Sequence, residues 1–397
     1  MSQSFVHLPV DRVIYGAGAL ADLPREVERL GKRRALVITG NSIATKTGLL
    51  DRVVGLLADR CAGTFTGSVQ HVPRRTILDA AAAAREARAD CLVSLGGGSP
   101  IDTTKAVALC LTEGVSDESG LEVFTSRHIT NRAGARLSAS APPIPHIAIP
   151  TTLSAGEHTG HFGTADEAQR RKDGGGHPLL VPRVVILDPE VTRDTPEWLW
   201  ASTAIKALDH AVERFCTPTH QPLTDALCLE AIRLLTSELP VTLHSPDRLD
   251  ARLACQLAAW FSMFGAFNAR TALSHAIGHQ LGGRCNVPHG QTSCVLLPHV
   301  MAFNVPAAAE RLALIGEAAG VVTAGKSAEE TARAACKTVG RFIKALGCPT
   351  TLREVGVTEA DLAPLAEATF AELVPEAGPR PVRSPEEILE ILRAAWE

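Results

Sequence analysis

Four histidines stand at spacings that suit a shared site. In SHAIGHQLGGRCNVPHG, His275 and His279 are four residues apart, so a helix would place both on one face. His289 follows a short glycine-containing loop, and His210 lies in a second predicted helix, AIKALDHAVERF. Imidazoles that converge from two helices can hold a divalent metal, which polarises a substrate oxygen and eases hydride transfer. A single such histidine is more often packed in a core than part of a site. The prediction of a site therefore rests on all four histidines together.

The segment LGGGSPIDTTKA at 95–106 predicts an anion site. Gly97 and Gly98 follow a buried-type strand, and Ser99 precedes a helix that opens at Pro100. Backbone N–H groups in such a turn can approach an anion closely because no Cβ intervenes, and the helix N-terminus adds its positive dipole end. The turn therefore predicts a pyrophosphate site. The alternative is a glycine-rich turn that only connects a strand to a helix.

A second glycine motif, GAGALA at 16–21, fits the ordinary dinucleotide fingerprint in letters but is rejected. It follows a weak strand near the chain start, and the next apolar run ends at Gly40 and Asn41 with no acidic residue. An Asp or Glu at that place would hold an adenosine 2′-OH and repel a 2′-phosphate. Gly40 and Asn41 therefore leave room for NADPH as well as NADH.

Short apolar runs alternate with helical patterns in the first half of the chain. Strands are predicted at 35–39, 91–95, 146–150 and 184–189, with a helix at 78–90, which indicates a parallel sheet covered by helices. We predict an open α/β domain over 1–190 and an all-helical domain over 191–397, whose first helix has Thr195 as N-cap and Pro196 at its first position. Residues 112–145 are predicted to be an irregular surface excursion without an assigned role.

Composition limits the classes of partner. The formal net charge is −4, and no run of Lys or Arg marks a surface for nucleic acid or an anionic membrane. The ten cysteines are scattered singly, which predicts reduced thiols and a cytoplasmic protein. No signal-like start is present, and no stretch reaches the ~18 apolar residues of a membrane span. We expect a small-molecule substrate and neither nucleic acid nor membrane as partner.

Several separate motifs together resemble those of iron-containing (group III) alcohol dehydrogenases. They are GGGSPID at 96–102, IPTT at 149–152, LDP at 187–189, and HAIGHQLGG through VPHG to LLPHVMAFN at 275–304. The resemblance covers essentially the whole chain. It implies a dehydroquinate synthase-like fold of two domains, with the active cleft between them, and homodimers. It also implies NAD(P) contacts from Gly97, Gly98, Ser99, Asp102, Thr151 and Thr152.

The resemblance also implies a metal site, with one substitution. The family's ligands, an Asp and three His, fall on Lys206, His210, His275 and His289. An ammonium offers no lone pair and adds positive charge where the metal's charge would lie, so weak or absent Fe²⁺ or Zn²⁺ binding is predicted. Asp209 does not simply replace the missing ligand, because it lies about 100° from His210 around the helix. Our hypothesis is that Lys206 takes the metal's place as electrostatic stabiliser or proton donor.

Lys206 and two further features resemble the maleylacetate reductase branch of this family. PTTLSAGE at 150–157 looks like that branch's shorter motif, and the stretch from Phe65 ends in His71-Val72-Pro73. Gly278-His279 and VPHGQTS instead look more like the alcohol dehydrogenases. His279 is the candidate proton relay. Cations for a dicarboxylate substrate are available, in loops near these motifs, from Lys172, Arg171, His158 and Arg284, each of which is as readily an ordinary surface charge.

The sequence thus predicts an NAD(P)H-dependent reductase of an oxo-acid or enone, of maleylacetate reductase type. A metal-dependent alcohol or aldehyde dehydrogenase would share every motif. A lyase like dehydroquinate synthase would show no net change in cofactor absorbance during turnover. A non-catalytic binding protein is the most distant alternative, which failure to bind NAD(P)H would favour.

Overall fold

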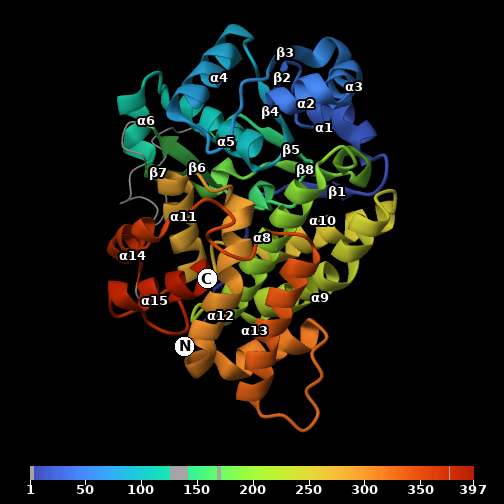
Figure 1. Cartoon of the computed structure of the whole chain (residues 1–397). Helices are drawn as coiled ribbons and strands as arrows, with labels where there is room; N and C mark the ends of the chain where they lie inside the picture. The colour runs from blue at the N-terminus through green and yellow to red at the C-terminus, as the bar shows by residue number, and fades with distance from the viewer. Residues whose placement is uncertain (1–3, 126–141, 168–170, 375) are drawn as a thin grey trace. The chain divides into compact units, whose positions relative to one another are not determined.

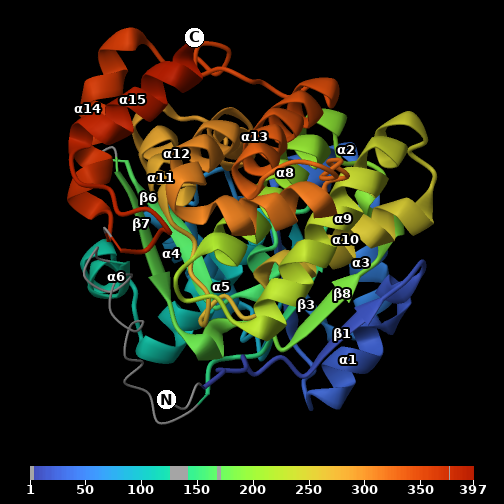
Figure 2. The ribbon, with the colours of Figure 1, turned by 90° about the horizontal axis from the view of Figure 1, so that it is seen from below.

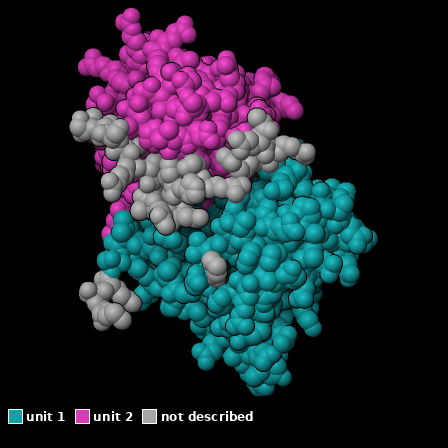
Figure 3. All heavy atoms as spheres, turned by 90° about the vertical axis from the view of Figure 1, so that its left-hand side faces the viewer, with its two compact units in different colours: residues 1–6, 196–397 teal, residues 7–195 magenta. Residues whose placement is uncertain are grey.

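The computed structural model describes residues 4–125, 142–167, 171–374 and 376–397, which form the two compact units of Figure 3. One unit is His7–Thr195, and the other is Pro196–Glu397 together with residues 4–6. The predicted division at 190/191 lies slightly before this boundary. Residues 191–195 belong to the first unit because the short helix η5 (Pro189–Thr192) continues from the sheet, and Thr195 Oγ1 donates to the Thr151 carbonyl at 2.7 Å.

A six-stranded parallel sheet forms the centre of the unit His7–Thr195 (Figures 1 and 2). Its strands are β1 (Arg12–Tyr15), β2 (Ala35–Thr39), β3 (Cys61–Phe65), β4 (Cys91–Gly96), β5 (His146–Pro150) and β8 (Val184–Leu187). Their order is β1-β8-β5-β4-β2-β3, and every neighbouring pair is parallel. The predicted α/β class and the four predicted strands are confirmed, the last strand ending two residues early.

Helices cover both faces of this sheet, which explains why its strands are continuous apolar runs. Val37 packs into one core cluster, while its neighbours Leu36 and Ile38 pack into another, because alternate strand residues point to opposite faces. The first cluster includes side chains of α1 (Leu23–Arg29) and α3 (Leu49–Leu57). The second includes side chains of α4 (Arg74–Glu86), which is the helix predicted at 78–90, and of α5 (Gly98–Glu113).

The remaining elements of this unit are short. They are α2 (Asn41–Lys46), α6 (Glu118–Thr125), the 3₁₀ helices η1 (Ala19–Asp22), η2 (Ala58–Arg60), η3 (Gly156–His158) and η4 (Pro178–Leu180), and the antiparallel pair β6 (His161–Asp166) and β7 (Arg171–Gly176). The irregular excursion predicted from 112 is therefore wrong at its start. Thr112 and Glu113 complete α5, and Asp117 then accepts the N–H of Gly120 at 2.8 Å as α6 begins. Residues 126–141 of that excursion lie outside the described residues.

The first glycine turn holds a carboxylate of the protein itself. Gly18 N and Leu20 N donate to the two oxygens of the Asp188 carboxylate, at 3.2 and 3.0 Å. Asp188 follows β8, which pairs with β1, so the sheet brings the carboxylate to this turn. These N–H groups already have an anionic acceptor, which agrees with the prediction that GAGALA is not the phosphate-binding turn.

Within the described residues, every regular element of the unit that begins at Pro196 is a helix (Figure 1). The helices are α8 (Glu197–Cys216), α9 (Pro222–His244), α10 (Leu249–Met263), α11 (Leu273–Cys285), α12 (His289–Ala318), α13 (Ala328–Ala345), α14 (Glu359–Glu372) and α15 (Pro385–Trp396). The predicted start of α8 is off by one residue: Pro196 is the N-cap, and the Thr195 hydroxyl makes no cap, since it donates to Thr151.

One helix, α12, is long and apolar enough to span a membrane by length and composition. However, 61% of its most apolar window is buried inside the unit, where α12 packs against α8, α11 and α13. Its apolar character is therefore accounted for by the core of this unit. Pro298 and Pro306 lie inside α12, and the backbone leaves helical geometry at Ala308.

Candidate active site

The glycine turn at 96–98 lies at the carboxyl end of β4, the edge at which open parallel sheets bind ligands. The helix begins at Gly98, two residues before the predicted start. Gly96 has φ +139°, a conformation that L side chains rarely adopt. A Cβ on Gly97 would lie 3.0 Å from Thr152 Oγ1, so glycine is what keeps this space open. The turn is a backbone cradle at the start of a long helix.

Two hydroxyls beside the turn are buried without a hydrogen-bond partner among the described residues: Thr152 Oγ1 and Ser154 Oγ. A Cβ on Gly97 would lie 3.0 Å from Thr152 Oγ1, and a Cβ on Gly98 would lie 3.5 Å from Ser154 Oγ. Unsatisfied buried hydroxyls are uncommon, and phosphate oxygens would accept from both. Thr152 was predicted and Ser154 was missed, although it continues the same PTT segment. The cradle therefore fits a pyrophosphate.

The other predicted cofactor contacts lie around the same edge. Thr151 is buried, and its N–H donates to the Gly96 carbonyl at 3.0 Å, so it fixes the turn through its backbone. Asp102 lies one helical turn into α5 and accepts from Lys105 Nζ at 3.1 Å and from Gly163 N at 3.0 Å. Its carboxylate thereby anchors β6, and contact with a cofactor stays a prediction.

Gly40 and Asn41 reach the same edge from the neighbouring strand. β2 pairs with β4 in the register Thr39↔Leu95, so Gly40 follows β2 just where the glycine turn follows β4. Gly40 is the N-cap of α2, and a Cβ there would lie 3.1 Å from the Ser68 carbonyl oxygen. Asn41 is exposed. No acidic side chain is supplied by either residue, as the sequence indicates.

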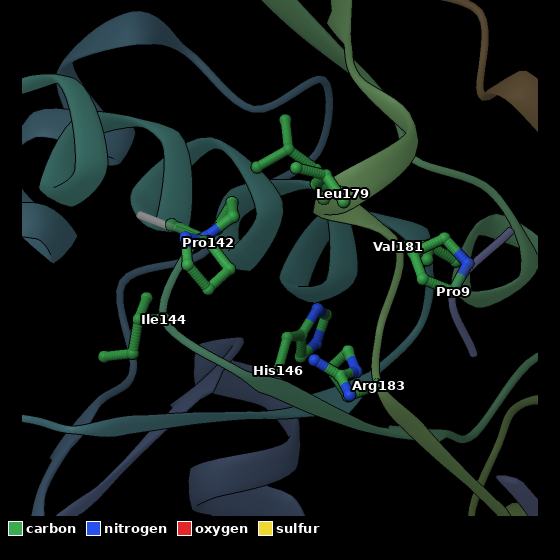
Figure 4. Close-up of a pocket in the computed structure, with 10 residues that line it drawn as sticks. Pro9, Pro142, Ile144, His146, Leu179, Val181 and Arg183 are labelled. Carbon is green, nitrogen blue, oxygen red and sulfur yellow. The ribbon is translucent and has the colours of Figure 1, made fainter. Parts of the chain in front are cut away.

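A small pocket in this unit lies at the opposite edge of the sheet (Figure 4). His146 is the first residue of β5, and Arg183 immediately precedes β8. The two residues lie side by side in the pocket, and the Arg183 N–H donates to the His146 carbonyl at 2.8 Å. His146 Nε2 also pairs with Ser94 Oγ at 2.7 Å. The rest of the lining is mostly apolar, with several prolines. Because dinucleotides bind at the carboxyl ends of parallel strands, this pocket is not the cofactor site.

In the helical unit the structure brings the four predicted histidines together. The ring of His275 stacks on His210, with centroids 4.8 Å apart, and meets His289 edge-on at 5.9 Å. His279 lies 5.7 Å from His289 and is the exposed member of the group. Glycines permit this: a Cβ on Gly278 would lie 2.8 Å from Thr292 Oγ1, so α11 and α12 approach closely there. Burial holds the pKa of His210 well below its usual value, and the nearby His275 and Lys206 lower it further, so His210 is neutral.

Lys206 lies on the same helix as His210 and is 2% exposed. Its Nζ donates to Asp209 Oδ2 at 3.3 Å. Burial lowers the pKa of Lys206, while the carboxylates of Asp209 and Glu213 act in the opposite direction and favour the ammonium. The structure thus places a lysine in the interior of this unit, beside the histidines and next to two carboxylates.

Those two carboxylates were missed as members of the site. Asp209 accepts from Ser274 Oγ at 2.9 Å and from Ser293 Oγ at 2.6 Å, in addition to Lys206. Glu213 Oε2 lies 2.8 Å from His275 Nδ1. A usable signal was present, since Lys206, Asp209 and Glu213 are spaced i, i+3 and i+7 on one helix face. The sequence analysis considered Asp209 only as a metal ligand beside His210, whereas its carboxylate pairs with Lys206.

The residues that could hold a metal here are not the set that the resemblance implies. Within the described chain, the group whose ligand atoms lie within 4.8 Å of one another is Asp209, Glu213 and His275, and it leaves out His210 and His289. Its carboxylates already accept from an ammonium and two serine hydroxyls, and one of them lies 2.8 Å from His275 Nδ1. Among the described residues of this cluster, Asp209 Oδ1 and the His210 Nδ1 atom are buried without a hydrogen-bond partner. The cation of this cluster is Lys206.

The cations proposed for a dicarboxylate substrate were predicted to lie in loops. They lie instead on helices and strands. Lys172 is on β7, as is Arg171, whose side chain is outside the described residues. Arg284 is in the last turn of α11 and donates to Gln280 Oε1 at 3.2 Å. His158 is 5% exposed and lies with Nε2 3.4 Å from Glu157 Oε1. His158 is therefore not a surface charge.

Two family models match the chain, and together they cover nearly all of it. Residues 10–189 match the model described as iron-containing alcohol dehydrogenase. Residues 200–396 match the model of the C-terminal part of the Fe-containing alcohol dehydrogenase family. The two matches meet close to the boundary between the two units.

Curated relatives and solved structures agree with these models. The chain is 37% identical over 321 residues to maleylacetate reductase 2 of Cupriavidus pinatubonensis (strain JMP 134 / LMG 1197), which covers 81% of this chain and 79% of that protein. It is 31% identical to lactaldehyde reductase of Escherichia coli (strain K12), covering 96% and 97% of the two chains. The crystal structure of maleylacetate reductase from Agrobacterium tumefaciens is similar with a TM-score of 0.81 and 29% identity, covering 100% of this chain and 98% of that one.

Proposed function

Because the chain belongs to the iron-containing alcohol dehydrogenase family, we propose that it reduces an oxo-acid or enone with NAD(P)H. The proposed substrate is maleylacetate, the product is 3-oxoadipate, and the setting is the degradation of aromatic compounds. Similarity to maleylacetate reductases supports this choice. One observation carries it: Lys206 is buried at 2% exposure, at the position where the family resemblance implies a metal ligand.

The proposed roles follow from the chemistry of each side chain. When bound on the glycine cradle, the nicotinamide cofactor supplies a hydride. Lys206 offers positive charge to the oxygen that becomes negative when the substrate accepts that hydride. His210, His275 and His289 surround the reacting group with imidazoles of which His210 is neutral. His279, which is exposed, relays a proton between solvent and the site.

Members of this family use NAD(P) and a metal, generally iron. We propose that this chain needs no metal, because Lys206 replaces a ligand and fills the local need for a cation. Enzyme stripped with a chelator is expected to oxidise NADH or NADPH with maleylacetate as fast as untreated enzyme, followed by absorbance at 340 nm, the ordinary wavelength for reduced nicotinamides. Addition of Fe²⁺ or Zn²⁺ is expected to change the rate by less than about twofold.

The same assay separates the alternatives. Reduction of small aldehydes alone, restored by added metal, would overturn the proposal in favour of a metal-dependent alcohol or aldehyde dehydrogenase. Similarity to lactaldehyde reductase is the observation that supports that second candidate. Turnover without net change in absorbance would instead indicate a lyase of the dehydroquinate synthase type.

We further propose that the chain accepts NADPH because Gly40 presents no carboxylate to a 2′-phosphate. Gly40→Asp is expected to raise the KM for NADPH about tenfold relative to that for NADH, by repulsion between two anions. Gly40→Asn is the matched control, since it has nearly the same size, meets the same Ser68 carbonyl and carries no charge. Equal losses of NADPH affinity in the two variants would show that bulk, and not charge, acts there.

The proposal extends to the protein's setting. We propose a cytoplasmic homodimer with neither nucleic acid nor membrane as partner. No disulfide joins any of the ten cysteines, all of which are in the described residues, and this supports a reducing compartment. The net charge of −4 agrees with the absence of a polyanionic partner.

A further inference from the structure

The carboxylate of Glu213 is held at the start of α11 by groups that can only donate. Its Oε1 accepts the Ser274 N–H at 2.7 Å, and its Oε2 accepts the Ala272 N–H at 3.0 Å. The side chain is 5% exposed, so solvent does not compete for these bonds. Backbone amides have no acceptor capacity, and both carboxylate oxygens are therefore fixed as acceptors. Glu213 cannot turn without leaving two buried N–H groups unsatisfied.

This arrangement decides how His275 carries its hydrogen. His275 Nδ1 lies 2.8 Å from the same Oε2 of Glu213. Two backbone N–H groups that can only donate, those of Ala272 and Ser274, point at the two Glu213 oxygens, and this is the environment of a carboxylate. Facing a carboxylate that only accepts, Nδ1 must bear the hydrogen, and the neutral ring then has its lone pair on Nε2.

We propose that Glu213 is a positioning residue, which fixes the orientation and the Nδ1–H form of His275 so that Nε2 is the atom presented to the substrate. The inference rests on the proposed function for its kinetic consequence, though not for the hydrogen position itself. The stacking of His275 on His210 holds the plane of the ring, and Glu213 holds its rotation within that plane. Carboxylates that orient metal-binding histidines typically contribute 10- to 100-fold to activity, and we expect an effect of the same order here.

Glu213→Gln is the sharpest variant, because the amide keeps the size of the carboxylate but turns one acceptor into a donor. Whichever way the amide lies, its NH2 group meets a backbone N–H, that of Ser274 or that of Ala272, so the side chain cannot keep its place. His275 Nδ1 then loses its fixed acceptor, and the ring is expected to change to the Nε2–H form. In wild-type protein labelled with ¹⁵N-histidine, the His275 signals, assigned by their loss in His275→Ala, are expected to show hydrogen on Nδ1. In Glu213→Gln they are expected to show it on Nε2.

Kinetics supply the second readout. Glu213→Gln is expected to lower kcat by about 10- to 100-fold with little change in the KM for the cofactor. Added to His275→Ala, the same change is expected to cause no further loss, because Glu213 acts through His275. Glu26→Gln is the matched control: it is also a buried glutamate, 1% exposed, but it pairs with Arg29 and Arg12 in the other unit, and kcat is expected to stay at the wild-type value.

Two results would overturn the proposal: hydrogen on Nε2 of His275 in the wild-type protein, or a further full loss of kcat on the His275→Ala background. If Glu213→Gln does not fold, Glu213→Asp replaces it, since this keeps the charge but withdraws the carboxylate by one methylene. The hydrogen position is measured without substrate, and the kinetics use whichever carbonyl compound the wild type reduces. If the wild type does not reduce maleylacetate, the proposed substrate is wrong. The role of Glu213 is then still tested by the hydrogen position on His275.

Discussion

Lys206→Met is expected to lower kcat for carbonyl reduction by about 10²- to 10³-fold, the usual effect of removing a charge or donor directed at a developing oxyanion. Methionine keeps most of the aliphatic volume of this 2% exposed side chain and deletes its charge. The KM for the cofactor is expected to change little, because the glycine cradle belongs to other residues. The measurement is steady-state oxidation of NAD(P)H, expressed per folded enzyme.

The same substitution leaves the buried carboxylate of Asp209 without its ammonium, although Ser274 and Ser293 still donate to it. Loss of one partner of a buried pair typically costs about 3–5 kcal/mol in the free energy of unfolding, so stability is measured alongside kcat by urea denaturation. Lys337→Met, an exposed lysine on α13, is the control and is expected to leave both quantities unchanged. A folded Lys206→Met protein with wild-type kcat would show that the lysine is only a counter-ion for Asp209.

Gly97→Val is expected to weaken NAD(P)H binding by about 100-fold. The first atom of the new side chain would lie 3.0 Å from Thr152 Oγ1, in the space between the backbone cradle and the two unpartnered hydroxyls. Loss of two charge-assisted hydrogen bonds to phosphate, each contributing about 1.5 kcal/mol, corresponds to roughly this factor. Quenching of protein fluorescence during titration with NADPH gives the dissociation constant.

Backbone strain does not confound the Gly97 result, since its φ of −82° and ψ of −159° are accessible to other residues. Gly55→Val is the matched control: nothing lies within 4 Å of its Cβ position on α3. This control is expected to bind NADPH as the wild type does. Equal affinity in the Gly97→Val protein would place the pyrophosphate elsewhere.

Short apolar runs in the sequence correctly predicted the strands that are buried on both faces of the sheet. The strands at 35–39 and 146–150 are buried on both faces, so their apolar runs mark them plainly. β7 could not be found in this way, because RKDGGG has no strand character and forms only by pairing with β6. There the glycines are required by close approach: a Cβ on Gly175 would lie 2.5 Å from Phe162 Cζ.

In the candidate site, too, contacts between nearby residues could be predicted and contacts between distant residues could not. The sequence grouped His275 and His279 by helical spacing and joined His289 and His210 to them, and the structure brings all four together. Glu213 escaped prediction because its partners are the N–H groups at the start of α11, some 60 residues later in the chain. A sequence shows that a helix begins at such a place but not which distant acceptor its first amides will meet.

The carboxylate of Asp188 has a consequence for stoichiometry. The chain has two glycine-rich turns after strands of one sheet, and a count by motif alone would allow two moles of dinucleotide per mole of chain. Asp188 already occupies the first turn as an intramolecular substitute for phosphate, accepting from Gly18 and Leu20. To displace it, a nucleotide would have to leave a carboxylate buried at 0% exposure without those donors. We therefore expect binding to saturate at one equivalent of cofactor per chain, because an anion of the chain itself holds the first turn.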